Sequence, residues 1–180
     1  MEKIILFTLT MGILIHFLYR EYLIRNIPKK AKGGLWKVMD FLVFVVIPLI
    51  QIWYNEVGRV KILDNSIIQL IGLALFITGI CLSFWGKYTL GKLWVTGWEY
   101  QIKKDHEIIK SGPFQYFKHP IYVGVILIAA GFELALSNIF VIIVLFVVIP
   151  LFAVQAKKEE KLLTAHFGNS YLEFKKNKIL

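Results

Sequence analysis

The stretch His106-Glu-Ile-Ile-Lys-Ser-Gly-Pro-Phe-Gln-Tyr-Phe-Lys-His-Pro-Ile-Tyr-Val-Gly124 is polar, basic and aromatic, and long apolar runs flank it. A second polar cluster, Gln155-Ala-Lys-Lys-Glu-Glu160, follows directly after the next two apolar runs. Only Ser137 and Asn138 separate those two runs, so a tight antiparallel helical hairpin is expected. Such a hairpin brings both polar clusters to one face, where they would form two walls of a site for a charged, soluble ligand beside lipid.

The composition of the chain is that of a membrane protein. Of its 180 residues 57% are hydrophobic, whereas soluble domains contain ~45–50%. A spanning helix needs roughly 20 residues, and flanking Lys, Arg, Trp and Tyr can extend a shorter one. The apolar runs are Ile4–Tyr19, Phe41–Tyr54, Ile67–Trp85, Ile121–Leu136 and Ile139–Val154. We therefore predict an all-α integral membrane protein with five transmembrane helices in one domain, 1–180, the first two helices lying in 1–66.

The net charge of +9 is distributed as in a membrane protein, not as in a nucleic-acid-binding protein. Three groups of six Lys and Arg residues lie at 20–37, 87–118 and 157–178. The remaining three are Lys3, Arg59 and Lys61. By the positive-inside rule this asymmetry predicts an N-terminus outside, with both large loops and the C-terminus in the cytoplasm. Most of these charges are expected to set the topology, and attraction to anionic lipid or cofactor is the alternative. Membrane lipids are expected partners of the chain, and the oligomeric state stays open.

Small residues predict how one of these helices packs. Gly72, Gly79 and Gly86 recur at intervals of seven in the third apolar run. Small side chains at helical spacing let membrane helices approach closely. We interpret the glycines as a packing stripe.

The two polar segments at the cytoplasmic side are expected to be structured. The loop from Lys87 to Lys118 is too long for a simple connection, and long loops are often functional. In the tail, apolar residues between Glu159 and Lys176 have the spacing of an amphipathic helix, interrupted or capped at Gly168. The prediction is a structured cytoplasmic loop and a cytoplasmic tail helix that packs back on the membrane face.

Ionisable residues inside or near the ends of apolar runs are functional suspects by default, because charge is expensive in lipid. His16 and Glu133 are such residues. Glu133 is close to the outer end of its apolar run, so we expect it at the membrane interface. His16 could simply form a hydrogen bond with a neighbouring helix.

The sequence contains no Gly-rich nucleotide fingerprint, P-loop, HExxH or paired CxxC motif. The residues with chemical potential are His106, Lys118, His119, Tyr122, Glu159 and Glu160. They suit a zwitterionic, cationic cofactor such as S-adenosylmethionine, which needs donors for its carboxylate and a carboxylate for its ammonium or ribose hydroxyls. The faces of aromatic rings also attract a positively charged sulfonium.

The competing interpretation of the same residues is structural. His-Pro is a common helix start, and Lys-Lys-Glu-Glu is a common solvated helix end. No metal site is expected, because no His/Glu pair has i,i+4 ligand spacing.

The later part of the chain carries an ordered set of motifs. They are Leu90-Gly91, His106, Gly112-Pro113-Phe114, Lys118-His119-Pro120-x-Tyr122-x-Gly124, Glu159-Glu160, Leu163, Phe167-Gly168 and Tyr171. Together they resemble the isoprenylcysteine carboxyl methyltransferase family, which is similar to the phospholipid methyltransferases. The resemblance covers roughly residues 67–176 and implies that 67–180 form a methyltransferase-like core with a cofactor site.

The resemblance implies S-adenosyl-L-methionine as the cofactor. The residues that it places around the cofactor are Gln101, with Glu99 as the alternative at that position, and His106, Glu107, Ile108, Ile109, Phe114, His119, Pro120, Ile121, Tyr122 and Glu159. It places Gln155, Glu159 and Tyr122 at the point of methyl transfer.

Three positions depart from the pattern of that family. Lys118 replaces the usual Arg, which keeps the charge but loses the planar fork. Phe114 replaces the usual Tyr and lacks its hydroxyl. Gln155 stands where the family often has an Arg associated with the acceptor, which puts the identity of the acceptor in doubt.

The function expected from these residues is S-adenosylmethionine-dependent methyl transfer to a lipophilic or lipid-attached acceptor at the cytoplasmic membrane face. The acceptor would be the carboxylate of a prenylcysteine-like substrate or another lipid-soluble nucleophile. Two alternatives stay open: an NADPH-dependent membrane reductase of the sterol or steroid type, and a non-enzymatic membrane scaffold.

Overall fold

The computed structural model describes residues 7, 10, 12, 42–54, 57–93, 107–176, 178 and 179. Its π-helical elements are η1 (Leu42–Val46) and η5 (Val144–Val148), and its 3₁₀ elements are η2 (Lys61–Leu63), η3 (Gly91–Leu93) and η4 (Gly112–Gln115). Its α-helices are α3 (Ile47–Trp53), α4 (Ser66–Leu90), α5 (Pro120–Ala135), α6 (Val141–Ile143), α7 (Ile149–Phe167) and α8 (Asn169–Lys175). Every one of these elements is helical, which confirms the predicted all-α class for this part of the chain.

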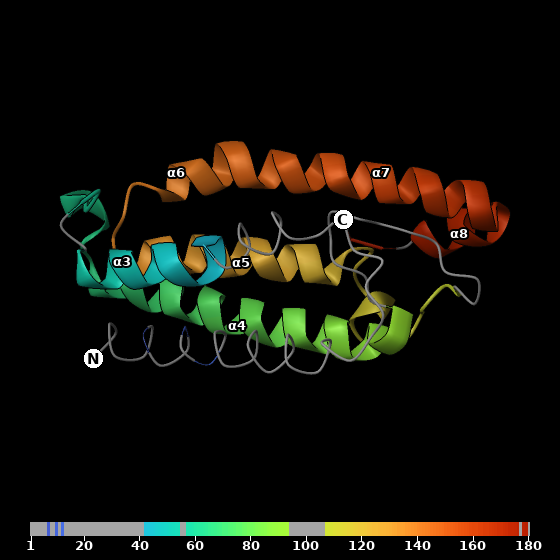
Figure 1. Cartoon of the computed structure of the whole chain (residues 1–180), viewed down its shortest axis with the longest axis horizontal. Helices are drawn as coiled ribbons and strands as arrows, with labels where there is room; N and C mark the ends of the chain where they lie inside the picture. Colours follow the sequence, from blue (N-terminus) through green and yellow to red (C-terminus); the bar gives the residue numbers. More distant parts are fainter. Residues whose placement is uncertain are drawn as a thin grey trace.

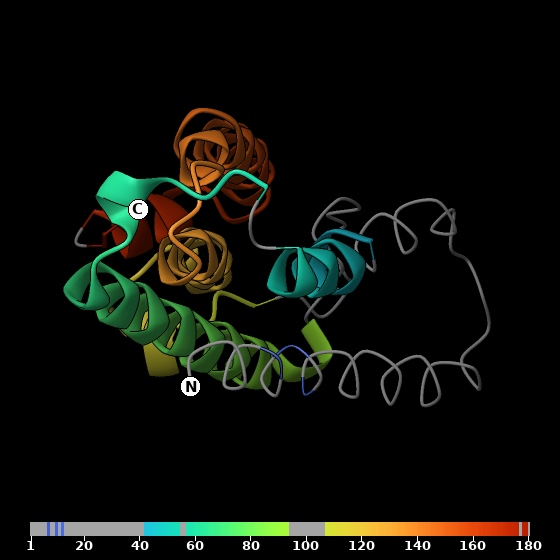
Figure 2. The same ribbon diagram turned by 90° about the vertical axis from the view of Figure 1, so that its left-hand side faces the viewer.

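Helix α5 lies between α4 on one side and the α6–η5–α7 helix on the other, with α3 beside it (Figures 1 and 2). The side chain of Asn65 starts α4 by accepting a hydrogen bond of 2.8 Å from the amide of Ile67, because the first amides of a helix have no partner within it. Gly91 ends α4 at a φ of 49°, a conformation that costs glycine little. α5 starts at Pro120, whose fixed φ suits the first helical position.

The predicted glycine stripe is the contact surface between α4 and α5. A Cβ added at Gly79 would lie 2.6 Å from the carbonyl oxygen of Gly124, and one added at Gly86 would lie 2.9 Å from Ile121 Cγ1. At Gly72 it would collide with the backbone of Ala135. The helices therefore pack antiparallel with their backbones in close approach, as small residues permit.

Two π-helical segments each lead into a proline. The same six residues, Phe-Val-Val-Ile-Pro-Leu, occur at 44–49 and at 146–151. The prolines are Pro48 in α3 and Pro150 in α7. Proline lacks an amide hydrogen and crowds the preceding turn, so the chain widens there into i→i+5 hydrogen bonding. The helix continues past Pro150, and α6, η5 and α7 form one unbroken path from Val141 to Phe167.

The turn between α5 and α6 is tight and fully buried. Ser137 has a φ of 57°, and both Ser137 and Asn138 are 0% exposed. Asn138 donates its amide to the Val57 carbonyl at 3.0 Å, and the Ser137 hydroxyl donates to the Leu63 carbonyl at 3.0 Å. The segment before α4 therefore clamps this turn, which holds the antiparallel hairpin that the sequence predicts.

Two helices are long and apolar enough to cross a membrane, Ser66–Leu90 and Val141–Phe167. Most of their apolar side chains face outward, as lipid contact requires: Leu70 is 65% exposed and Phe146 is 75% exposed. Helix α5 is apolar but has only 16 residues. The first predicted span lies outside the described residues except at positions 7, 10 and 12, so the count of five spans stays a prediction.

The predicted tail helix from Glu159 to Lys176 is present as two helices. Its first part is the end of α7, which continues from the apolar run to Phe167, and its second part is α8. The break falls at Gly168, as expected, where a φ of 56° ends α7 and starts α8. α8 folds back toward the start of α5 (Figure 1).

Candidate active site

A buried carboxylate joins α7 to the beginning of α5. Glu159 is only 8% exposed. The hydroxyl of Tyr122 donates a hydrogen bond to its Oε1, and Nδ1 of His119 lies 3.4 Å from its Oε2. The hairpin therefore brings together three of the residues that the sequence analysis named from the two polar clusters.

The neighbouring carboxylate, Glu160, has cationic partners instead. Its Oε1 lies 3.1 Å from Lys118 Nζ, and its Oε2 lies 3.4 Å from Lys175 Nζ in α8. His119 Nε2 is 3.5 Å from the same Oε1, but the arrangement does not meet hydrogen-bond geometry. Glu160 thus links α7 to α8 and to the segment that precedes α5, while Glu159 contacts the phenol and the imidazole.

The aromatic rings continue the cluster along the helices. The rings of His119 and Tyr122 stack with centroids 5.5 Å apart and planes at 12°. The ring of Tyr122 also meets that of Phe152, 5.0 Å away on α7. Nε2 of His119 is buried and, among the described residues, has no hydrogen-bond partner. A buried polar atom of this kind normally indicates a missing partner.

Gln155 lies one helical turn before Glu159 on α7, on the apolar side of the cluster, and is half-buried. Residues four apart project from the same helix face. The structure thus sets a neutral amide between the carboxylate and the membrane part of α7.

Other residues expected around the cofactor divide into two groups. Phe114 is buried in a second cluster with Tyr171 and Phe174 of α8, and Ile108 and Ile109 pack against that cluster. Pro120 and Ile121 face α4 at Gly86, so the structure gives both of them a helix-packing role.

Glu107 is exposed, and Gln101 and His106 lie outside the described residues. The cofactor contacts expected of these three residues stay predictions. So do those expected of the residues packed around Phe114 and of Pro120 and Ile121 at the α4 interface.

Sequence reasoning missed the residues that come from distant segments. Lys175 reaches Glu160 from the tail. Ile179 forms an isolated bridge with Phe117: its amide donates to the Tyr116 carbonyl at 2.9 Å, and its carbonyl accepts from the Lys118 amide at 3.1 Å. A Lys in an amphipathic tail and an Ile in a polar terminus carry no pattern that would identify these contacts.

The group implied for this site, S-adenosylmethionine, fits the residues present. Its ammonium and hydroxyls need an acceptor, and Glu159 is a carboxylate without a cationic Lys or Arg partner among the described residues. Nε2 of His119, which has no hydrogen-bond partner in the described part of the chain, offers one more polar contact. The ring of Tyr122 is already in contact with those of His119 and Phe152.

The apolar helices and the polar cluster at one end of them define a helical membrane protein with a polar site where the helices end. Residues 70–165, more than half of the chain, match the model of the isoprenylcysteine carboxyl methyltransferase (ICMT) family. The chain belongs to this family.

Curated proteins similar to this chain carry one name, protein-S-isoprenylcysteine O-methyltransferase. That of Saccharomyces cerevisiae is 35% identical over 78 residues, covering 43% of this chain and 32% of that protein. That of Schizosaccharomyces pombe is 36% identical over 75 residues, covering 41% and 31%. That of Homo sapiens is 26% identical over 166 residues, covering 89% and 58%. The chain thus spans between 31% and 58% of the length of these relatives.

Proposed function

We propose that this protein transfers a methyl group from S-adenosyl-L-methionine to a lipophilic acceptor at the cytoplasmic membrane face. The acceptor class is the carboxylate of a prenylcysteine-like molecule or another lipid-soluble nucleophile. The observation that carries the proposal is the buried Glu159 carboxylate held by Tyr122 and His119, in a chain of the ICMT family. The names of its relatives support the same reaction class.

The residues of the chain would act mainly by positioning. Bound S-adenosylmethionine would supply a sulfonium methyl group for direct in-line displacement. Glu159 would accept hydrogen bonds from the ammonium or ribose, with its orientation set by Tyr122. Glu160 is held by Lys118 and Lys175, so it would brace the wall of the site.

The acceptor side of the site would lie toward the membrane. Gln155 is one turn nearer the apolar part of α7 than Glu159, so its amide would contact the polar end of an acceptor whose apolar part stays in lipid. A carboxylate nucleophile needs no general base at neutral pH, because it is already ionised. Exclusion of water and a fixed approach geometry would then supply most of the rate enhancement.

The proposal is tested with the purified full chain in lipid nanodiscs. S-adenosylhomocysteine should bind saturably and NADPH should not, and radiolabelled S-adenosylmethionine should transfer its methyl group to a panel of lipophilic carboxylates and thiols. The variant Glu173→Gln, which changes an exposed carboxylate on α8, serves as the control and should bind S-adenosylhomocysteine as the wild type does. Saturable NADPH binding without S-adenosylhomocysteine binding would replace the proposal with a reductase.

A further inference from the structure

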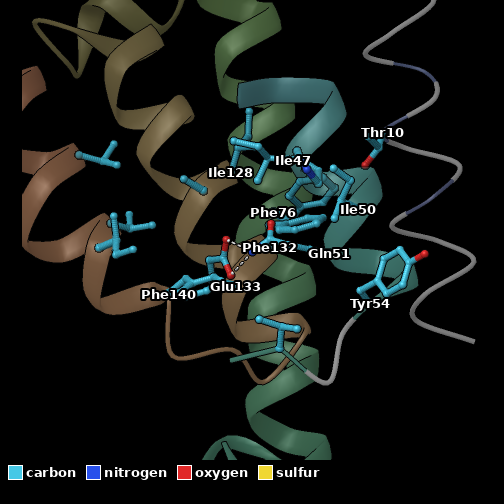
Figure 3. A pocket seen from close by; sticks show the side chains of 16 residues that line it. Thr10, Ile47, Ile50, Gln51, Tyr54, Phe76, Ile128, Phe132, Glu133 and Phe140 are labelled. Atoms are coloured by element: carbon cyan, nitrogen blue, oxygen red, sulfur yellow. Dashed lines mark hydrogen bonds between the residues drawn. The ribbon is translucent and has the colours of Figure 1, made fainter. Parts of the chain in front are cut away.

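A cavity of about 540 Å³ lies among α3, α4, α5 and η5, away from the His119–Glu159 cluster (Figure 3). Its walls are almost entirely apolar, and they include the rings of Tyr54, Phe76, Phe132 and Phe140. This volume is within the ~300–1,000 Å³ typical of small-molecule sites. The cavity is therefore large enough for an organic ligand.

Among the described residues that line this apolar space, the charged side chain is that of Glu133. Glu133 sits in the last turn of α5, and both of its carboxylate oxygens accept from the Gln51 amide of α3, at 3.1 and 3.2 Å. Figure 3 shows the carboxylate turned toward Gln51 beside Phe132. Gln51 is neutral, and no Lys, Arg or His of the described residues forms an ion pair with Glu133. A carboxylate in apolar surroundings is costly unless a cation compensates it.

The Glu133 end of this cavity is distinct from the proposed methyl-transfer site. Tyr122 and Glu133 are eleven residues apart on one helix, which separates them by about 16 Å along its axis. Glu133 lies next to the buried Ser137–Asn138 turn, at the opposite end of the hairpin from Glu159.

We propose that this cavity binds a lipophilic amine from the membrane, with its ammonium group on Glu133 and its apolar body against the aromatic walls. The carboxylate supplies the opposite charge, and the Gln51 amide holds it in place. The charge of the Glu133 carboxylate favours a cation over an anion or a neutral alcohol, and the aromatic rings pack against the apolar body of the ligand.

The test uses the full chain in nanodiscs and two diazirine probes, a long-chain primary amine and the alcohol of the same chain length. The amine should saturably label peptides from 47–57 and 128–148, with an affinity about tenfold above that of the alcohol. Glu133→Gln keeps the side-chain shape and should abolish this preference, whereas Glu173→Gln should retain it. S-adenosylhomocysteine affinity should be unchanged in Glu133→Gln, which separates this inference from the proposed function.

Equal affinity for amine and alcohol would overturn the proposal and leave a cavity for neutral lipid chains. Saturable amine labelling around Tyr122 instead of around Glu133 would also overturn it. Comparison of the two probes on the wild-type chain needs no variant, so the proposal stays testable even where Glu133→Gln fails to fold.

Discussion

At the scale of single residues, the two adjacent carboxylates of α7 have different surroundings. Glu159 meets a phenol and an imidazole, whereas Glu160 meets two lysines. By residue type alone either carboxylate could serve the cofactor, and the family resemblance selects Glu159. The structure is consistent with that choice, because the lysines contact Glu160 and leave Glu159 without them.

Replacing Glu159 with alanine should weaken S-adenosylhomocysteine binding by at least about tenfold, or ~1.4 kcal/mol, the loss expected for a charged hydrogen bond. Isothermal titration of the folded variant in nanodiscs measures it. Glu173→Ala on the exposed face of α8 should bind as the wild type does. Unchanged affinity in Glu159→Ala would remove this residue from the site.

Gln155 should determine which acceptor is used. An Arg there could hold a substrate carboxylate by two parallel charged hydrogen bonds, whereas Gln offers a neutral amide. Gln155→Arg should therefore raise methyl transfer to farnesylcysteine analogues, to which the wild type should transfer poorly. Methyl transfer to a matched lipophilic thiol serves as the control. Efficient wild-type turnover of the analogues, insensitive to changes at Gln155, would contradict this prediction.

At the scale of elements, the glycine stripe determines how closely α4 can approach α5. Gly79→Ala places a methyl group 2.6 Å from a backbone carbonyl oxygen, and such overpacking typically costs ~1–3 kcal/mol even though alanine favours helix more than glycine does. The midpoint of thermal unfolding should therefore fall. Thr78→Ala, on the adjacent exposed position, should change it little. Equal midpoints in the two variants would mean that the helices have room to separate.

The spacing of residues in the sequence predicts which face of a helix packs, but not which residues it packs against. Gly72, Gly79 and Gly86 are visible as a stripe in the sequence, but their partners on α5 follow only from the antiparallel register of the helices. The two π segments were not predicted by the hydrophobic period either. Each precedes a proline, which disturbs the hydrogen bonding of the turn before it.

At the scale of the whole molecule, the distribution of Lys and Arg predicts that the tail is cytoplasmic and that the α3–α4 connection is outside. In a chain carrying Cys81→Ser, Ser170→Cys should react with an impermeant maleimide only from the cytoplasmic side. Lys61→Cys should react only from the opposite side, and both positions are exposed. Reaction of Ser170→Cys from outside would invert the topology.

The sequence by itself determined the helical membrane class, the glycine packing stripe and the return of Glu159 to His119 and Tyr122. These features are local in origin, because apolar length, small-residue spacing and a two-residue turn act over neighbouring positions. Only the tertiary structure decided that Lys175 braces Glu160 and that Ile179 pairs with the segment before His119. It also decided that Gln51 and Glu133, 82 residues apart, share a cavity. Such contacts depend on the relative placement of whole helices, which the packing of many side chains sets together and no local pattern records.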